Sequence, residues 1–486
     1  MEEVDPIADF LRNKSILITG STGFLAKIFV EKVLRVQPDV KQLFLVIRAE
    51  DAKQRLHDEV IAKELFKVLK DKYGSNFNSF ISDKVTPVTG DISCINLGVT
   101  DPDLKENLWN EIDIVVNIAA TTKFDERYDV ALGINTLGAK HVLDFAKKCV
   151  KLKMLLHVST AYVCGERSGL ILEKPFKMGE TLNGAPGLDI EHELKLAQEK
   201  RNELRIQLAT EKEEAIAMKV LGMQRSKFYG WPNTYVFTKS MGEMLLGDLR
   251  ENTSLCIIRP TIITSTYAEP FPGWMEGLRT IDSIATAYGT GKLACFLGNY
   301  DLILDLIPGD MVVNAMLAAI YINANQHNEC IYQVGSSNSH PLKATTVRDL
   351  GYKYFLNNPW VDENGKPVIV SKPKHLPTET SFLTYMAFRY QLPLMGLQVV
   401  NAIFCNYFLR LYTDSNRKIN YVLRCFQLYK PYLFFKGTFD DSNLKNLRMT
   451  NKSGLETYYF DPKVIDWEDY FINTHAPGLL KYVLKR

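Results

Sequence analysis

The chain has few of the features that mark metal-binding, disulfide-rich or nucleic-acid-binding proteins. Its eight cysteines form no CxxC pair and mostly lie in apolar runs, and its eight histidines are scattered. Neither a metal site nor a disulfide framework is therefore expected. An excess of one charge is also missing, because 58 basic residues are balanced by 56 acidic ones. The net charge of +2 gives no reason to expect nucleic acid as a partner.

The amino terminus lacks the segments that direct proteins into other compartments. Residues 1–5 (MEEVD) have neither the basic and apolar regions of a secretory signal nor the arginine- and serine-rich character of a transit peptide. We therefore expect the protein on the cytosolic side of the cell's membranes. At 486 residues, of which 46% are hydrophobic, the chain is long for one domain and is predicted to form two.

A glycine-rich turn follows the first apolar run. Residues 15–19 (SILIT) predict a buried strand, residues 24–35 have helical periodicity, and Gly20 and Gly23 lie in the turn between them. Such glycines let backbone amides approach a pyrophosphate at the amino terminus of the helix. An ordinary strand-turn-helix connection is the alternative. The cofactor contacts predicted in this segment are Thr19, Gly20, Thr22, Gly23, Phe24 and Leu25.

The second predicted strand, residues 42–47, indicates which nicotinamide cofactor to expect. It ends in Arg48, where an NAD-specific site tends to have an acidic residue for the ribose hydroxyls. A guanidinium there suits a 2′-phosphate, so the sequence favours NADPH over NADH. Glu50 and Asp51 lie nearby, and the alternative is that Arg48 is only a solvated surface charge.

Further apolar runs at residues 84–88, 113–118 and 153–158 alternate with helical segments, which predicts a Rossmann-like, doubly wound parallel sheet. Ligands bind at the carboxyl edge of such a sheet. Asp91 is positioned to form a hydrogen bond with the adenine. Ala119 and Ala120 are small enough to leave room for the cofactor. An N-cap aspartate and small packing residues are the alternatives. Ile92 and Pro260, the latter after a strand at 255–259, complete the predicted cofactor contacts.

Tyr235 and Lys239 are the predicted catalytic pair. Because they are four residues apart, both side chains leave one face of a helix, where the ammonium could lower the pKa of the phenol. A second hydroxyl must hold the substrate oxygen, and Thr160 or Ser159, after the strand at 153–158, could provide it. His157, inside that strand, is expected to be a packed residue and not a ligand.

Two segments interrupt the α/β pattern. The chain is strongly charged and helical from about residue 188 to about residue 229. This pattern predicts an inserted helical hairpin, with a substrate lid as the alternative. Residues 269–277 (EPFPGWMEG) are rich in glycine, proline and aromatic residues. This loop either borders the substrate pocket or serves packing.

From about Leu376 the pattern changes to aromatic-rich helices, so we divide the chain into a reductase domain, 1–375, and a mainly helical domain, 376–486. Residues 390–409 carry no charge, and as one helix this stretch would be just long enough to span a bilayer. The polar residues and the proline within them favour a buried or interfacial helix instead. Basic and aromatic residues then alternate from Arg417 to Lys436, as suits an anionic membrane surface or acyl-CoA phosphates, although a solvated face is the default.

With these residues assembled, the chain resembles the extended short-chain dehydrogenase/reductase family, and within it the plant-type alcohol-forming fatty acyl-CoA reductases. The resemblance covers nearly the whole length. It is carried by residues 19–27 (TGSTGFLAK), 117–126 (NIAATTKFDE), 157–164 (HVSTAYVC), 230–239 (GWPNTYVFTK), 258–277 (IRPTIITSTYAEPFPGWMEG), 429–441 (YKPYLFFKGTFDD) and 460–470 (FDPKVIDWEDY).

The resemblance implies a reaction and a role for each site residue. The glycines and Arg48 would hold NADPH, Thr160 and Tyr235 the substrate carbonyl oxygen, and Lys239 the nicotinamide ribose. A long-chain fatty acyl-CoA would be reduced to a bound aldehyde and then to a primary alcohol, consuming two NADPH. An enzyme that stops at the aldehyde and a non-catalytic NADPH-binding scaffold are the alternatives. The resemblance also implies the cytosolic face of the endoplasmic reticulum, and alcohols destined for wax, suberin or pollen-wall lipids.

Overall fold

A seven-stranded parallel sheet forms the centre of the protein. The computed structural model describes residues 5–450 and 457–485, and its sheet has the order β12-β7-β5-β4-β1-β2-β3, with every pairing parallel. The predicted doubly wound fold is therefore confirmed. The strands are β1 (Ser15–Thr19), β2 (Gln42–Ile47), β3 (Val85–Thr89), β4 (Ile114–Asn117), β5 (Met154–Val158), β7 (Leu255–Pro260) and β12 (Glu329–Val334).

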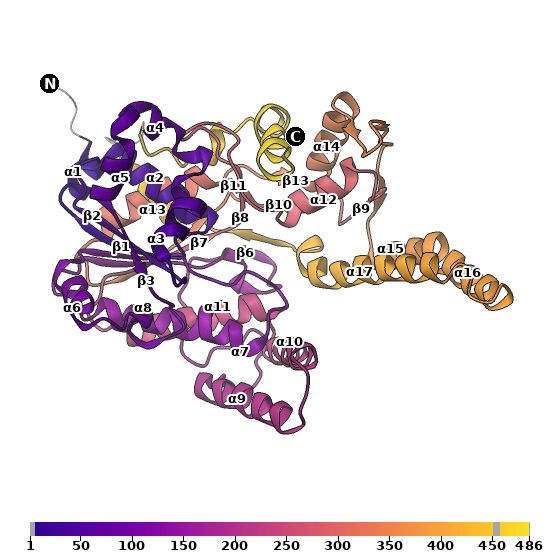
Figure 1. Cartoon of the computed structure of the whole chain (residues 1–486), viewed down its shortest axis with the longest axis horizontal. Coiled ribbons are helices and arrows are strands. Elements are labelled where there is room, and N and C mark those ends of the chain that lie inside the picture. Colours follow the sequence, from indigo (N-terminus) through magenta and orange to yellow (C-terminus); the bar gives the residue numbers. More distant parts are fainter. Residues whose placement is uncertain (1–4, 451–456, 486) are drawn as a thin grey trace.

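Helices cover both faces of this sheet, which is why its strands are nearly continuous apolar runs. Helices α2 (Phe24–Val36) and α13 (Gly309–Asn323) pack on one face, and α8 (Gly138–Ala146) and α11 (Thr234–Leu249) on the other, as Figure 1 shows. The strand order reverses between β1 and β4. A ligand crevice is expected at the carboxyl ends of those two strands.

Shorter elements connect and extend the layers. The helices are α1 (Pro6–Leu11), α3 (Ala52–Leu56), α4 (Lys67–Tyr73), α5 (Phe77–Lys84), α6 (Pro102–Glu111), α7 (Tyr128–Ala131), α12 (Thr280–Gly289) and α14 (Ala344–Asn357). Small two-stranded pairs join β8 (Ile262–Thr264) to β11 (Leu306–Pro308), β9 (Cys295–Leu297) to β16 (Lys374–Leu376), β10 (Ile303–Leu304) to β13 (Leu342–Lys343), and β14 (Trp360–Val361) to β15 (Pro367–Val368).

The charged insertion is a helical hairpin of α9 (Ile190–Ile206) and α10 (Glu211–Phe228) that packs beside α7 and α11 (Figure 1). Its key contact is the fully buried carboxylate of Glu193, which binds the guanidinium of Arg225 and accepts a hydrogen bond from the hydroxyl of Tyr128 at 2.6 Å. A buried carboxylate is tolerated when it is paired in this way. The hairpin is thus anchored to the reductase core.

After β16 the chain leaves the core as an arm of α15 (Glu379–Met386), α16 (Leu392–Ile403) and α17 (Leu409–Leu433), drawn in orange in Figure 1. The uncharged stretch at 390–409 is not one helix, because left-handed backbone at Cys405 and Asn406 separates α16 from α17. Nor is it buried, since most of its large apolar side chains are exposed. Among the described residues, no helix combines the length and the apolar character needed to cross a membrane.

The chain then returns to the core. β17 (Gly437–Phe439) pairs with β6 (Gly169–Ile171), and α18 (Ser442–Thr450) packs on β12. The short helices α19 (Trp467–Asp469) and α20 (Ala476–Gly478) follow. Buried side chains after β17, among them Phe460 and Tyr470, belong to the same hydrophobic cluster as those of α2 and α13.

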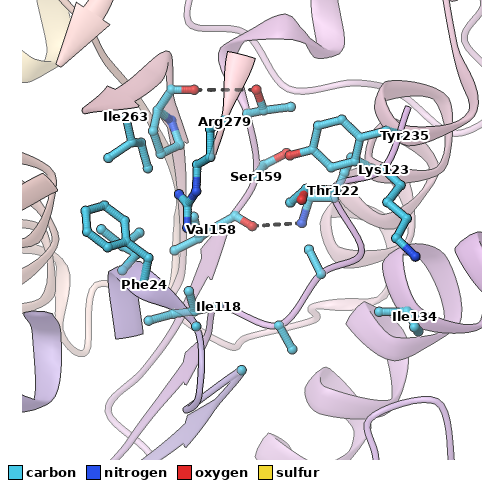
Figure 2. A pocket seen from close by; sticks show the side chains of 18 of the residues that line it. Phe24, Ile118, Thr122, Lys123, Ile134, Val158, Ser159, Tyr235, Ile263 and Arg279 are labelled. Carbon is cyan, nitrogen blue, oxygen red and sulfur yellow. Dashed lines mark hydrogen bonds between the residues drawn. The ribbon is translucent and has the colours of Figure 1, made fainter. Parts of the chain in front are cut away.

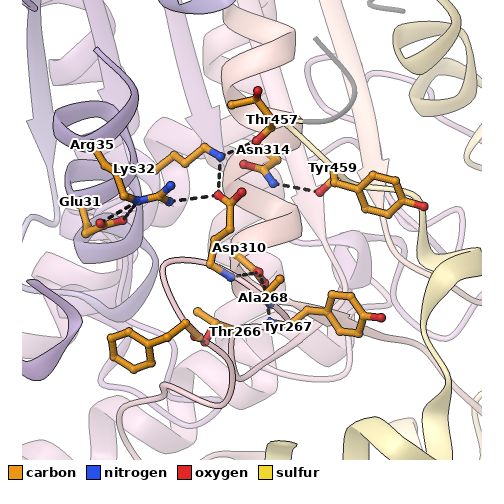
Figure 3. A network of polar contacts seen from close by, with 12 residues as sticks. Glu31, Lys32, Arg35, Thr266, Tyr267, Ala268, Asp310, Asn314, Thr457 and Tyr459 are labelled. Carbon is orange, nitrogen blue, oxygen red and sulfur yellow. Dashed lines mark hydrogen bonds and ion pairs between the residues drawn. The ribbon is translucent and has the colours of Figure 1, made fainter. Parts of the chain in front are cut away.

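Polar contacts fix this returning segment and the loop at residues 265–277 against α2 (Figure 3). The carboxylate of Glu269 pairs with both Lys32 and Arg35, and the ammonium of Lys32 also donates to the carbonyl oxygen of Thr457. Asp310 accepts hydrogen bonds of 2.8 to 2.9 Å from the backbone amides of residues 267–269. The loop therefore has a fixed conformation next to the crevice.

Candidate active site

A cavity of about 810 Å³ opens at the carboxyl edge of the sheet, where the reversal of strand order predicts a ligand site. It is lined by residues that follow β1, β2, β3, β4, β5 and β7, by α11, and by the last turn of α17. The predicted site residues that line it are Gly20, Thr22, Gly23, Phe24, Leu25, Arg48, Asp91, Ile92, Ala119, Ala120, Thr160, Tyr235, Lys239 and Pro260.

Thr19 is the one predicted cofactor contact that does not line the cavity. Its side chain is fully buried, and its hydroxyl donates a 2.6 Å hydrogen bond to Oδ1 of Asn117 while accepting one from the amide of Ala119 at 3.3 Å. The prediction placed it in the lining because it is the last residue of the strand. Its role in the structure is to tie the end of β1 to the end of β4.

The glycine-rich turn has the geometry that an anion site requires. Gly20 has φ of +68°, and a Cβ atom there would lie 2.7 Å from the backbone of Ala119, so only glycine fits. Gly23 precedes α2 without a capping side chain. The first amides of α2, at Phe24 and Leu25, therefore remain available at the cavity wall, where the helix dipole favours negative charge.

Two arginines lie at the end of the cavity that follows β2. The side chain of Arg48 is 68% exposed, and its Nη1 lies 3.7 Å from a carboxylate oxygen of Asp91. Arg55, on α3, also lines the cavity and donates a 2.7 Å hydrogen bond to the carbonyl oxygen of Arg48. Arg55 was not among the residues predicted from the sequence, although its place on the helix after the second strand was a usable signal.

Asp91 stabilises a turn and also lines the cavity, while its bond to the adenine stays a prediction. One carboxylate oxygen accepts hydrogen bonds from the amide of Ser93 at 2.9 Å and from its hydroxyl at 2.7 Å, so it caps the turn after β3. The residue also lines the cavity beside Ile92. Ala119 and Ala120 line it as well, and the close approach of Gly20 shows that the backbone here is tightly packed.

Tyr235 stands in the first turn of α11, which begins where Asn233 accepts a 3.1 Å hydrogen bond from the amide of Val236. Its side chain points into the cavity (Figure 2). The hydroxyl of Thr160 lines the same cavity and donates a 3.5 Å hydrogen bond to the carbonyl oxygen of Pro260. Burial raises the pKa of Tyr235 to about 12. The phenol therefore keeps its proton at neutral pH.

Lys239 lies one turn further along α11 and is almost completely buried. Its Nζ donates to the carbonyl oxygen of Val158 at 2.8 Å and contacts Nε2 of His157 at 3.0 Å. Burial lowers the pKa of Lys239 to about 8. The expected lowering of the Tyr235 pKa by this ammonium is not observed, and the cation that lowers it is Arg279. His157 is a packed residue, as predicted, with Nδ1 3.0 Å from Nδ2 of Asn117.

The choice between Ser159 and Thr160 follows from their contacts. Both line the cavity, but only the Thr160 hydroxyl affects the pKa of Tyr235, which burial raises and Thr160 lowers. The hydroxyl of Ser159 is buried and has no hydrogen-bond partner among the described residues. Thr160 is therefore the better placed of the two to share a substrate oxygen with Tyr235.

Sequence analysis missed an aromatic wall near Tyr235. It includes Phe124, whose ring centroid lies 6.2 Å from that of Tyr235, and Tyr429 and Tyr432 from the last turns of α17. The hydroxyl of Tyr432 accepts a 2.8 Å hydrogen bond from Asn233, the residue that caps α11. The helical arm thus contributes side chains to the cavity, from residues almost 200 positions away in sequence.

The loop at residues 269–277 serves packing and does not line the cavity. Trp274 is 2% exposed and stacks on Phe24 with ring centroids 5.2 Å apart. The residues immediately after this loop, Leu278, Arg279 and Thr280, do line the cavity. The inserted hairpin contributes no described residue to the lining, so the hairpin alternative fits the structure better than the lid.

Comparisons with known proteins agree with this geometry. Residues 18–316 match a family model described as Male sterility protein, and residues 389–486 match a second model with the same description. The chain is 53% identical over 492 residues to "Alcohol-forming fatty acyl-CoA reductase" of Simmondsia chinensis, with both chains covered fully. It is 54% identical to "Probable fatty acyl-CoA reductase 4" of Arabidopsis thaliana, covering 98% of this chain and 99% of the other.

Solved structures show the same fold at low identity. The terminal R domain from the myxalamid PKS-NRPS biosynthetic pathway is 17% identical, with a TM-score of 0.56, covering 96% of this chain and 91% of that one. The reductase (R) domain of a non-ribosomal peptide synthetase from Mycobacterium tuberculosis is also 17% identical, with a TM-score of 0.55, covering 99% and 96%. At this identity the likeness concerns the architecture alone.

Proposed function

The chain belongs to the family of alcohol-forming fatty acyl-CoA reductases, and on that basis we propose that it reduces long-chain fatty acyl-CoA to primary fatty alcohol and CoA with NADPH. The observation that carries the proposal is the juxtaposition, in one cavity, of a dinucleotide-type glycine turn and the hydroxyls of Tyr235 and Thr160. The aromatic wall beside that pair provides an apolar surface for the substrate.

Each part of the cavity suits one part of NADPH. The amides at the start of α2 would bind the diphosphate, and Arg48 and Arg55 the 2′-phosphate, because guanidinium groups match phosphate geometry. Asp91 and Ile92 would border the adenine. The rest of the cofactor would lie in the space beside Ala119, Ala120 and Pro260. Lys239 would contact the nicotinamide ribose from α11.

The residues around the reacting carbon supply hydrogen bonds and a proton. NADPH held by these residues would supply the hydride for reduction of the thioester carbonyl and then of the aldehyde. Tyr235 and Thr160 stabilise the oxyanion that develops on the thioester, and its collapse expels CoA as a thiolate. In the second step the phenol of Tyr235 gives its proton to the alkoxide. Its pKa of about 12 suits this role, because the group is still protonated at neutral pH.

Two successive reductions at one cavity require two molecules of NADPH for each alcohol formed. The aldehyde must then stay in place while the cofactor exchanges. The wall formed by Phe124, Tyr429 and Tyr432 supports such retention, since an alkyl chain against it is shielded from water. An enzyme without this retention would release free aldehyde.

We divide the chain functionally at residue 375, into a reductase part and a carboxyl-terminal part that binds a membrane surface through the arm. Along α16 and the turn before it, Phe388, Leu392, Met395, Val399 and Ile403 recur at helical spacing, and each is 49% to 69% exposed. Residues three and four apart share one helix face, so these side chains form a continuous apolar stripe. We call it the arm stripe.

The charges around the arm stripe favour a lipid surface as its partner. Arg389 and Arg410 flank it, both are exposed, and residues 387–411 contain no acidic side chain. An exposed apolar helix face bordered by cations is typical of helices that lie in the interface of an anionic bilayer. Binding there would place the enzyme on the cytosolic face of the endoplasmic reticulum, the location that the family resemblance implies.

Vesicle flotation tests the membrane part. Replacing Met395, Val399 and Ile403 together by aspartate should abolish flotation with vesicles that contain anionic phospholipid. A matched control is the pair Ile206→Asp and Leu208→Asp, since these side chains are at least 82% exposed on the inserted hairpin. Truncation before Leu376 is a poorer test, because it removes buried residues of the returning segment. Equal flotation of the arm variant and the control would contradict the assignment.

The reductase part is tested by product analysis. Purified protein, NADPH and acyl-CoAs from medium to very long chain are incubated, and the lipid products are identified by mass. Primary alcohol from one range of chain lengths is the expected result. Accumulation of free aldehyde would instead assign an aldehyde-forming reductase, and no turnover with any acyl-CoA would reject the proposed substrate.

A further inference from the structure

Arg279 is a cation of the cavity that the mechanism above does not use. It is the N-cap residue of α12, and its side chain extends into the cavity toward Phe24 and Val158, as Figure 2 shows. The centre of its guanidinium lies 4.7 Å from the centroid of the Phe24 ring. Phe24 is the first residue of α2, so the guanidinium lies close to the helix terminus that is expected to bind phosphate.

Within the described part of the chain, no carboxylate is in direct contact with this guanidinium. Among the described residues, Arg279 has no ion pair within 4.0 Å and no hydrogen bond through its side chain. The two nearest acids are engaged elsewhere. Glu276 pairs with Lys27 at 2.5 Å, and Asp282 contacts Nε2 of His475 at 2.9 Å. The guanidinium is instead exposed within the cavity, where a ligand can reach it.

An arginine that lines a ligand cavity without an ion-pair partner is available to an anionic group of the ligand, because guanidinium groups match phosphate geometry. We propose that Arg279 binds the diphosphate of the dinucleotide cofactor, from the side opposite to the amides of α2. The inference rests on the proposed cofactor site and adds to it a residue outside the glycine-rich turn. The diphosphate would then lie between the helix terminus on one side and a guanidinium on the other.

The position along the cavity separates this role from that of Arg48. Arg48 and Arg55 follow β2 and approach Asp91, at the end assigned to the 2′-phosphate. Arg279 lies instead over Phe24, at the start of α2. A group that binds the diphosphate contacts NADPH and NADH alike, whereas one that binds the 2′-phosphate contacts NADPH alone. The diphosphate of the acyl-CoA is the other possible source of the same chemistry.

The returning carboxyl-terminal segment holds this arginine in place. Asp282, one turn along α12 from Arg279, is 3% exposed and binds His475, whose Nδ1 lies 3.1 Å from the hydroxyl of Ser265. The hydroxyl of Tyr470 also donates to the carbonyl oxygen of Ser265 at 2.9 Å. These buried contacts fix the first turn of α12. Asp282 and His475 are positioning residues for the cofactor site.

Direct binding titrations test the proposal. NADPH and NADH are titrated separately, without substrate, into wild-type protein, Arg279→Gln, Arg279→Lys and the surface control Arg12→Gln, which lies at the end of α1. Loss of a charge-assisted hydrogen bond should raise the Kd of Arg279→Gln about 10- to 100-fold for both nucleotides. Arg279→Lys should lose less nucleotide affinity than Arg279→Gln, and the control should bind both nucleotides as the wild-type protein does. Thermal unfolding checks that each variant is folded.

The outcomes separate the possible errors. An unchanged Kd in folded Arg279→Gln overturns the proposal while the cofactor site stands. A rise in the Kd for NADPH alone assigns Arg279 to the 2′-phosphate and also overturns the diphosphate proposal. A KM for acyl-CoA that rises while both nucleotide affinities stay constant transfers the contact to CoA and overturns the assignment to the cofactor. Wild-type protein that binds neither nucleotide would overturn the proposed function itself.

Discussion

Replacing Tyr235 by phenylalanine removes one oxygen atom from the centre of the cavity and leaves the aromatic ring in place. In the proposed reaction this oxygen donates a hydrogen bond to the developing oxyanion and later a proton to the alkoxide. The ring packs near Phe124, with centroids 6.2 Å apart, and that contact survives the substitution. The change therefore affects the reaction steps and spares the packing.

The expected loss follows from the two roles of the hydroxyl. Removing one oxyanion donor costs about 10²- to 10³-fold in kcat, and losing a positioned acid costs about 10²- to 10⁴-fold. Because one group performs both tasks, the losses do not simply multiply. Thr160, which lines the same cavity, remains as a donor. We therefore expect kcat to fall about 10³-fold, with the Kd for NADPH changed less than about threefold.

The assay measures NADPH oxidation with saturating acyl-CoA, together with NADPH binding in the absence of substrate. Tyr432→Phe is the matched control, since it removes a hydroxyl from the same cavity that contacts Asn233 and has no assigned chemical role. This control should keep kcat within about tenfold of wild type, the cost of one neutral hydrogen bond. A Tyr235→Phe enzyme that turns over at the wild-type rate would refute the mechanism.

Three further predictions concern the cofactor and the fold. Arg48→Ala should raise the KM for NADPH about 10- to 100-fold in initial-rate assays and leave that for NADH nearly unchanged; an equal effect on both would contradict its role. Because the pKa of Lys239 is lowered to about 8, its charge is present below that pH and is lost above it. Hence kcat/KM for NADPH should decline above about pH 8, and this decline should be absent in Lys239→Met. Glu269→Gln leaves buried Lys32 without its carboxylate and should cost about 3 kcal/mol in urea unfolding. The exposed control Glu251→Gln should cost under about 0.5 kcal/mol, and equal losses would contradict the network's role.

Much of the fold could be predicted because its determinants are local. Continuous apolar runs identified six of the seven strands, to within one or two residues at each end. The missed strand, β12, has polar Glu329 and Gln333 within it, so its apolar run is short. The prediction of one helix over the uncharged stretch at 390–409 was wrong, because left-handed backbone at Cys405 and Asn406 breaks it. The buried alternative was also wrong, since most of its large apolar side chains are exposed, whereas the interfacial alternative stays a prediction.

The candidate site could be predicted where it depends on short spacings. The glycine turn and the pair Tyr235 and Lys239 each lie within a few residues, and their geometry follows from one turn or one helix. Tyr432 and Arg279 could not be found in this way. They reach the cavity only because α17 returns to the core and because the 265–277 loop is fixed against α2. Their positions depend on contacts between segments far apart in sequence.

The central claim is that one cavity performs two successive reductions on the same acyl group. The most direct test counts NADPH oxidised per molecule of primary alcohol formed, with purified protein, one acyl-CoA and a chemical trap for free aldehyde. The account predicts two NADPH for each alcohol and almost no trapped aldehyde. One NADPH per acyl-CoA consumed, with the product recovered as trapped aldehyde, would contradict it.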